Sequence, residues 1–454
     1  PISISQMPAD WKGKLRTFRY FAMLANPVTH IRNFFGNGAF MPAVGIKNAI
    51  GAGLESVFVK EGDRTKAVHA GRELKQFAKQ DALDQKDVLT GEAKYNITDQ
   101  VERERKYFGG LMQKAIDKNS DLLEKEDWFF LKRHYANALA GWMQANNMTP
   151  EQLQKDKAKL DEARSYAVLE AQKATYRDAS DFATALNKLG QNSKVAGFIA
   201  EAAIPFKKTP ANILKRGIEY SPIGLLSTIT AGSRRLAQYN EWVANGQKGN
   251  MPKKALSPSQ YIDKIASGLT GTGVAALGAL MSAMGWVRVG FGDDDETEKQ
   301  NGEQEYSLKV KLFGHDVSYT IDWLAPMSMP FFVGASLYNE LTKEHGDENG
   351  MAIATGIMDS LLEISEPIFN LSMLDGVNSL LNTQSYSDTG NNITDIGATL
   401  LSNYATSFVP TVLGKVAKTI DTTRRETYVP SGTSKTEALI QKTWPKTLAK
   451  IPRS

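Results

Sequence analysis

The chain has 454 residues, of which 42% are hydrophobic and 23% are charged, so its length allows a sizeable core and its composition excludes wholesale disorder. It contains no cysteine, which excludes disulfides, thiolate metal sites and cysteine nucleophiles. The net charge of +4 is unevenly distributed: residues 1–260 hold 39 basic and 27 acidic residues, residues 261–414 hold 6 and 20, and residues 415–454 hold 9 and 3. Basic ends around an acidic middle favour either contact with polyanions or mutual neutralisation inside the fold.

Composition and charge divide the chain into five regions. These are a basic apolar helical region (1–60), a charged helical region (61–200), a basic helical region with a linker (201–260), an apolar, acidic region with a hairpin and a membrane-active segment (261–414), and a basic tail (415–454). We therefore predict a mainly α protein, a multi-helix assembly with one β-hairpin near 306–321.

A proline turn at Asn26–Pro27 predicts the start of a helix, because proline suits the first helical position. Residues 36–38, Gly-Asn-Gly, are expected to interrupt this helix. Asn33 lies one turn inside it, where a buried amide can tie the preceding loop to a neighbouring element. We therefore predict a structural role for Asn33.

The clearest helix start lies at residues 149–152. Thr149 can cap the helix, Pro150 occupies its first position, and Gln152 can return a hydrogen bond in a capping box. The pattern predicts a helix that continues to about Leu189 and stops at Gly190.

A second proline turn, Thr209–Pro210, opens a basic helix in which Asn212 is expected to play the same structural role as Asn33. Positive side chains gather around it, with tyrosines nearby, as on surfaces that bind phosphate backbones. The predicted polyanion-binding residues are Lys207, Lys208, Lys215, Arg216, Arg234 and Arg235. No base-reading motif accompanies them, so we expect DNA binding that is independent of sequence and strongly salt dependent. A solvated basic face is the competing interpretation.

Residues 265–287 contain no charged residue and are rich in glycine, alanine and serine. At about 1.5 Å per residue, a helix of this length crosses a hydrocarbon core of roughly 30 Å. Small residues also allow the close helix packing found in membranes. The predicted membrane segment runs from Ile265 through Gly273 and Gly278 to Val287. A buried helix of a soluble protein is the competing interpretation.

The one clear β pattern lies at residues 306–321. Apolar residues alternate with polar ones on both sides of a turn at Gly314–His315, which is typical of a hairpin. An isolated hairpin is marginally stable in water, so this one is expected to pack against another element.

Signatures of catalysis are weak throughout the sequence. The five histidines, which show no metal-ligand spacing, are His30, His69, His134, His315 and His345. Gly271-Thr272-Gly273 follows no strand and lacks the third glycine of a dinucleotide fingerprint. The acidic run 293–296 lacks the spacing of a calcium loop and is interpreted as a solvated loop. We therefore expect no enzymatic activity, no cofactor and no metal ion.

Five phrases of the sequence, taken together and in order, resemble a known family. They are NPVTHIRNFFGN (26–37), PFKKTPANILKRG (205–217), DWLAPMSMPFFVGA (322–335), ISEPIFNLSMLDGVNSLL (364–381) and VPTVLGKVAKTIDTTRRETY (409–428). The chain resembles the helical C-terminal portion of the large polyvalent proteins of tailed phages and prophages, which are carried in the virion and enter the host with the DNA. The family has no defined catalytic residues, and this chain lacks the attached enzymatic domains of the usual arrangement.

The resemblance implies an internal virion protein of the cargo or ejection type, cut from a larger precursor. We expect it to lie in the virion interior, to be delivered with the genome, and to reach the host cell envelope on infection. The expected partners are other virion proteins, the DNA backbone and host membrane lipid, with oligomer formation left open. The alternative is a structural virion component that binds portal or capsid proteins without lipid contact. An uncharacterised enzyme is the third and least favoured class.

Overall fold

The computed structural model describes residues 27–90, 108–178, 208–289, 304–312 and 315–342, together with residues 14, 17, 18, 21, 22 and 25. The predictions for Lys207, the acidic run 293–296 and the basic tail 415–454 lie outside these residues. Over the described residues the chain is mainly α-helical with one small sheet, which confirms the predicted fold class.

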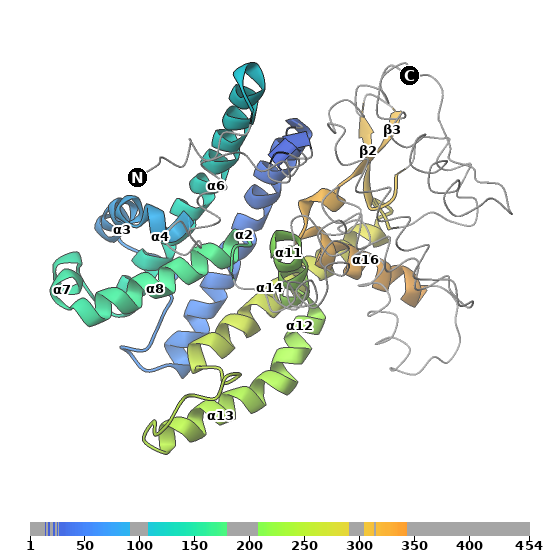
Figure 1. Cartoon of the computed structure of the whole chain (residues 1–454). Helices are drawn as coiled ribbons and strands as arrows, with labels where there is room; N and C mark the ends of the chain where they lie inside the picture. Colours follow the sequence, from blue (N-terminus) through green and yellow to red (C-terminus); the bar gives the residue numbers. More distant parts are fainter. Residues whose placement is uncertain are drawn as a thin grey trace, which may run out of the picture.

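The helices fall into two groups that meet at α2. They are α2 (Pro27–Phe58), α3 (Arg72–Asp84), α4 (Lys86–Thr90), α6 (Gly110–Ala145), α7 (Pro150–Lys155), α8 (Lys157–Ala174), α11 (Lys208–Glu219), α12 (Pro222–Ser227), α13 (Ser233–Ala244), α14 (Pro258–Ala283) and α16 (Ser328–Thr342). Figure 1 shows α3, α4 and α6 to α8 on one side of α2, with α11 to α14 on its other side. The sheet and α16 lie farthest from the first group (Figure 1).

The first group is held by a core between α3, α6 and α8. Large side chains of α6 fill it, and the fully buried ones include Leu131, Tyr135, Leu139 and Met143. They pack against buried alanines of α3 and α8, whose small side chains let the helices approach closely. Burying each large side chain contributes about 1.5–3 kcal/mol relative to leaving it in water.

Helix α14 is the centre of the second group. It begins with a capping box in which Ser257 and Gln260 exchange hydrogen bonds, with Pro258 at the first position. It packs against α2, α12 and α16, and a π-helical turn, Thr228–Gly232, joins α12 to α13. The second core therefore forms around a helix that the sequence marks as apolar.

The predicted interruption of the first helix at residues 36–38 is wrong, since α2 runs unbroken from Pro27 to Phe58. The Asn37 amide Nδ2 donates to the carbonyl of Asn33 at 2.9 Å and so bonds within the helix. A Cβ at Gly36 would lie 3.6 Å from the Trp323 carbonyl oxygen, so tertiary contacts cover this part of the helix. The start at Pro27 is confirmed.

The capping box at Thr149 and Gln152 is confirmed, but the long helix predicted after it is wrong. The helix is interrupted at Asp156, whose side chain accepts a hydrogen bond from the Lys159 backbone N–H and caps α8. Helix α8 then ends at Ala174, well before Leu189. A second capping residue inside the pattern thus divides it into two helices.

The predicted hairpin is confirmed as β2 (Ser307–Leu312) and β3 (His315–Thr320), which pair antiparallel with Val310 opposite Val317. A short strand β1 (Val287–Arg288) pairs with β2 on the other side, in the order β1-β2-β3. Tyr306 and Phe332 of α16 meet edge to face at 5.4 Å, so the sheet packs on α16 as expected.

Candidate membrane-contact surface and its buried charge network

One side of α14 is exposed and carries no charge. We call this side the outer face; it consists of Leu269, Gly273, Ala276, Leu277 and Leu280, together with Met284 directly after the helix. Its members recur at intervals of three or four residues, so they follow one side of the helix. Leu277 is 50% exposed and Leu280 is 53% exposed. Single exposed leucines are ordinary, but a continuous apolar stripe is typical of a contact surface.

The opposite side of α14 is built from small residues in backbone contact with its neighbours. A Cβ added at Gly271 would overlap the backbone of Tyr220, and one at Gly278 would overlap the carbonyl of Phe331 in α16. Gly334 of α16 meets the backbone of Ala275 in the same way. Close backbone approach through small residues is the packing mode of helices in lipid, where no hydrophobic force drives association.

The elements packed on α14 also expose apolar side chains. Ile46, Val57 and Phe58 of α2 are exposed, as are Leu226 of α12 and Ile229 of the π-helical turn. The charged residues of α2 after Arg32, Lys47 and Glu55, are instead buried. A water-soluble surface helix usually exposes its charges, whereas α2 buries them together with the apolar Phe40, Ala43 and Val44.

The buried charges of α2, α8 and α14 form one network with Lys66. Lys47 Nζ lies 2.8 Å from a carboxylate oxygen of Glu170 and 2.8 Å from one of Asp263. Lys66 and Lys173 reach Asp263 at 3.1 and 3.5 Å. Glu55 anchors the loop after α2, because its carboxylate accepts hydrogen bonds from the backbone N–H groups of Thr65 and Lys66, at 2.7 and 2.9 Å.

The network holds its members in their charged forms. Burial alone lowers the pKa of the Lys47 amine, but Asp263 and Glu170 outweigh burial and hold this pKa above its usual value. Burial and the Asp263 charge raise the pKa of Glu170, yet the three lysines outweigh both and bring this pKa to about 2. Buried ion pairs add little net stability, but losing one partner leaves a costly unpaired charge. The network therefore fixes how α2, α8 and α14 meet.

The predicted polyanion-binding residues do not form one surface. Arg216 is only 5% exposed and pairs with Asp178 and Glu219, and Lys215 pairs with Asp178 at 2.9 Å. The prediction for Arg216 is therefore wrong, because a buried and paired guanidinium is not available to a phosphate. Lys208 begins α11. Arg234 and Arg235 are exposed on α13, with no ion-pair partner among the described residues.

The predicted membrane segment is only partly helical and only partly exposed. Gly273 lies on the outer face and Ile265 is half-buried. Gly278 faces α16, and Val287 is buried in strand β1. Gly278 and Val287 are therefore covered in this arrangement, and their part in a membrane segment stays a prediction that requires a conformational change. The helix ends at Ala283, because the next residues turn to supply a sheet strand.

One small cavity lies beside the network within the described part of the chain. Among the described residues, no group of three His, Asp or Glu side chains could hold a metal ion. A cavity of about 20 Å³ lies beside Lys47, Glu170 and Asp263, which is room for about one water. His134, also buried, has its pKa lowered to about 4 by burial and by the charge of Lys47.

The buried charge network is not among the predictions from the sequence, although the sequence contains a signal for it. Lys47 is the only charged residue between Arg32 and Glu55, and Asp263 comes just before the uncharged run. A lone charge in an apolar helix is expected to have a buried partner. Which partner it finds depends on residues more than a hundred positions away, such as Glu170.

Comparison of the chain with protein-family models, with curated protein sequences and with solved structures finds no significant match to any of them.

Proposed function

We propose that this chain is an internal virion protein of a tailed phage, released from a larger precursor and delivered with the genome, which contacts lipid through the outer face of α14. The observation that supports the lipid contact is the continuous uncharged outer face. Charged residues of α2, α8 and α14 are instead buried in the network. The phage assignment rests on the resemblance of the five sequence phrases.

Burial argues against α14 being an ordinary core helix. It is the one helix among the described residues that is long and apolar enough to cross a membrane, and 39% of its most apolar stretch is buried. A core helix of a soluble protein would be mostly buried. Leu269, Leu277 and Leu280 instead face outward from a tightly packed inner side.

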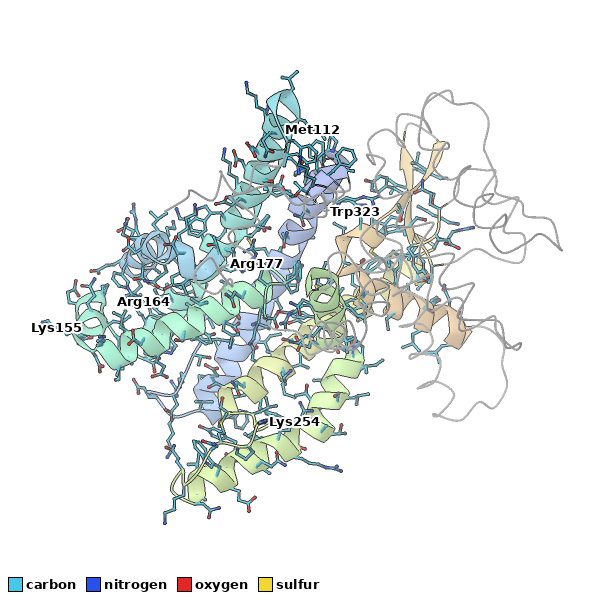
Figure 2. The ribbon with its side chains drawn as sticks, viewed as in Figure 1. Met112, Lys155, Arg164, Arg177, Lys254 and Trp323 are labelled. Atoms are coloured by element: carbon cyan, nitrogen blue, oxygen red, sulfur yellow. The ribbon has the colours of Figure 1, made fainter. Side chains whose placement is uncertain are left out.

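A cluster of exposed cations lies next to α14 and favours an anionic membrane. Arg234 and Arg235 of α13 are followed by Lys248, Lys253 and Lys254 in the segment that leads into α14. Figure 2 shows Lys254 beside the start of that helix. Juxtamembrane Lys and Arg contribute about 1 kcal/mol each at an anionic surface. These cations support headgroup phosphates as the polyanion that this part of the chain meets.

Flotation with lipid vesicles tests the proposal. The wild type is expected to float with vesicles that contain phosphatidylglycerol, and less with neutral vesicles, because the cations contribute. Leu277→Asp/Leu280→Asp is expected to abolish flotation, since one Asp in a lipid-facing helix costs about 2.5–3.5 kcal/mol on insertion scales. Gln154→Asp, at an exposed position of α7, far from α14 in Figure 1, is the control for an added surface charge and should float normally.

Two results would contradict the lipid contact. If the wild type floats with neither kind of vesicle, the outer face would instead fit the alternative function, contact with portal or capsid proteins. If the double variant floats as well as the wild type, the lipid-binding surface lies elsewhere. Gly278 is unsuitable for this test, because any side chain there overlaps the Phe331 carbonyl and disturbs the fold itself.

A further inference from the structure

A second cationic surface lies on the other group of helices. A pocket of about 710 Å³ opens between α3 and α6, a size within the range of roughly 300–1,000 Å³ typical of ligand sites. Five of the residues that line it are cations: Lys75 and Lys79 of α3, and Lys125, Lys132 and Arg133 of α6. No acidic residue lines it among the described part of the chain.

The cations of this pocket are not engaged in ion pairs with described residues. Four nearby carboxylates of α3 and α6 are instead engaged elsewhere. The pairs are Asp81 with Arg164, Glu124 with Lys86, Glu126 with His30, and Asp127 with Arg177. Figure 2 labels Arg164 and Arg177, which mark two of these pairs along α8 and just beyond its end. The pocket therefore keeps a positive potential that attracts an anion.

Two aromatic side chains form part of the wall between the cations. Trp128 is half-buried, with the Lys86 ammonium 5.8 Å from its ring centroid. Phe129 is 47% exposed, and its ring is held by Phe34 and Phe130 at centroid distances of 5.8 and 5.1 Å. A positioned aromatic ring beside a row of cations is the combination that binds single-stranded nucleic acid, since every base has a face that stacks.

We infer that this pocket binds a short single-stranded segment of nucleic acid, with phosphates on the cations and bases stacked on Trp128 and Phe129. The number and spacing of the cations favour a strand over a lipid headgroup. Lys75 and Lys79 are one helical turn apart, and Lys125 and Lys132 lie about 10.5 Å apart along α6. A strand offers repeated negative charges over that length, whereas one phospholipid offers its charge at a single point. The site shares no residue with the outer face of α14, so it stands apart from the lipid contact.

Fluorescence anisotropy with a labelled ten-nucleotide oligothymidylate tests the site. The wild type is expected to bind this strand more tightly than a duplex of equal length at low salt, because a duplex hides its bases. Lys79→Gln/Lys132→Gln is expected to weaken binding and to reduce the slope of log K against log salt concentration by about 1.4, at roughly 0.7 for each lost phosphate contact. Lys157→Gln/Lys159→Gln on α8 removes the same charge from exposed positions that have no ion pair with a described residue, and should leave the slope unchanged.

Stacking of a base on the Phe129 ring is tested by a separate variant. Phe129→Ala is expected to weaken strand binding by about 5- to 150-fold, the loss of one stacked base, with duplex binding little changed. Thermal unfolding of each variant shows whether it is folded. If Phe129→Ala does not fold, the double variant Lys79→Gln/Lys132→Gln still tests the site.

Three results would overturn the inference. They are no strand binding by the wild type at low salt, equal loss of affinity in the two lysine double variants, or equal affinity for strand and duplex. Loss of vesicle flotation in Lys79→Gln/Lys132→Gln, with strand binding intact, would assign the pocket to lipid instead. Leu277→Asp/Leu280→Asp should bind the strand normally, so this inference and the lipid contact fail separately.

Discussion

At the scale of single residues, Asn212 shows how one buried amide joins two elements. Its Nδ2 donates to the carbonyls of Tyr176 and Asp178, at 2.9 and 2.7 Å, and so ties α11 to the segment after α8. Its side chain is fully buried. The buried tie to a neighbouring element is therefore present as predicted, and its contribution to stability stays a prediction. Asn33 is half-buried, and its role stays a prediction.

Replacing Asn212 is expected to destabilise the protein. Asn212→Ala removes both donors and leaves two buried carbonyls unpaired, which should lower the free energy of unfolding by about 1–3 kcal/mol. Urea unfolding followed by circular dichroism measures the change. Asn240→Ala, at an exposed position of α13, is the control and should stay within about 0.5 kcal/mol of the wild type. Equal stability of the two variants would refute the role of Asn212.

At the scale of elements, α14 carries two kinds of glycine on opposite sides. Gly278 lies in backbone contact with α16, while no described residue lies within 4 Å of a Cβ at Gly273 on the outer face. Sequence alone treats both as weak points of a helix, at about 1 kcal/mol each. Packing distinguishes the two glycines, because only the inner one, Gly278, is required for the close approach of two backbones.

The same substitution at these two glycines is expected to have opposite effects. Gly273→Ala should raise the free energy of unfolding by up to about 1 kcal/mol, because alanine favours the helix and meets no neighbour. Gly278→Ala should lower it by about 1–3 kcal/mol or more, because the added Cβ forces α14 and α16 apart. Thermal and urea unfolding of both variants measure the sign of the change in the free energy of unfolding. Stabilisation by both would contradict the packing of α14 on α16.

At the scale of the whole molecule, the buried charges join the two groups of helices. Lys47 of α2 meets Glu170 of α8 and Asp263 of α14, and His134 of α6 is buried nearby. His134 has a folded pKa of about 4, below its usual value of 6.5, because of burial and then Lys47. As the pH falls, the imidazole of His134 is therefore protonated in the unfolded chain before it is protonated in the folded protein. This difference reduces the free energy of unfolding between about pH 6.5 and 4.

The free energy of unfolding is expected to decrease in two steps as the pH is lowered. From pH 7 to 5 the free energy of unfolding should drop by about 2 kcal/mol through His134. Glu170 has a lowered pKa of about 2, so its contribution is present above its usual value of 4.5 and is lost as the pH falls from there toward 2. Urea unfolding at pH 7, 5 and 3 measures both steps.

A histidine variant separates the two steps. His134→Gln should remove the loss between pH 7 and 5, while His69→Gln, at an exposed position, should keep it. If the wild type is equally stable at pH 7 and 5, or if His134→Gln loses as much stability as the wild type, then His134 is not the group that titrates. The second step should persist in both variants.

Local signals in the sequence determined the starts of the helices and the hairpin. Pro27 opens α2, Thr149 and Gln152 form their capping box, and alternation at 307–320 forms two paired strands. Each of these features depends on residues within a few positions of one another, so their side chains and backbone geometry suffice to predict it. The uncharged run 265–287 likewise predicted most of a helix.

Only the tertiary structure decided which side of α14 is exposed, where α8 ends and which cations are free. Arg216 and Arg234 look alike in the sequence, yet one is buried against Asp178 and the other is exposed on α13. Lys47 and Glu170 are 123 residues apart, and the pocket between α3 and α6 combines lysines from separate helices. Burial and charge pairing depend on contacts between distant parts of the chain, and no local pattern contains them.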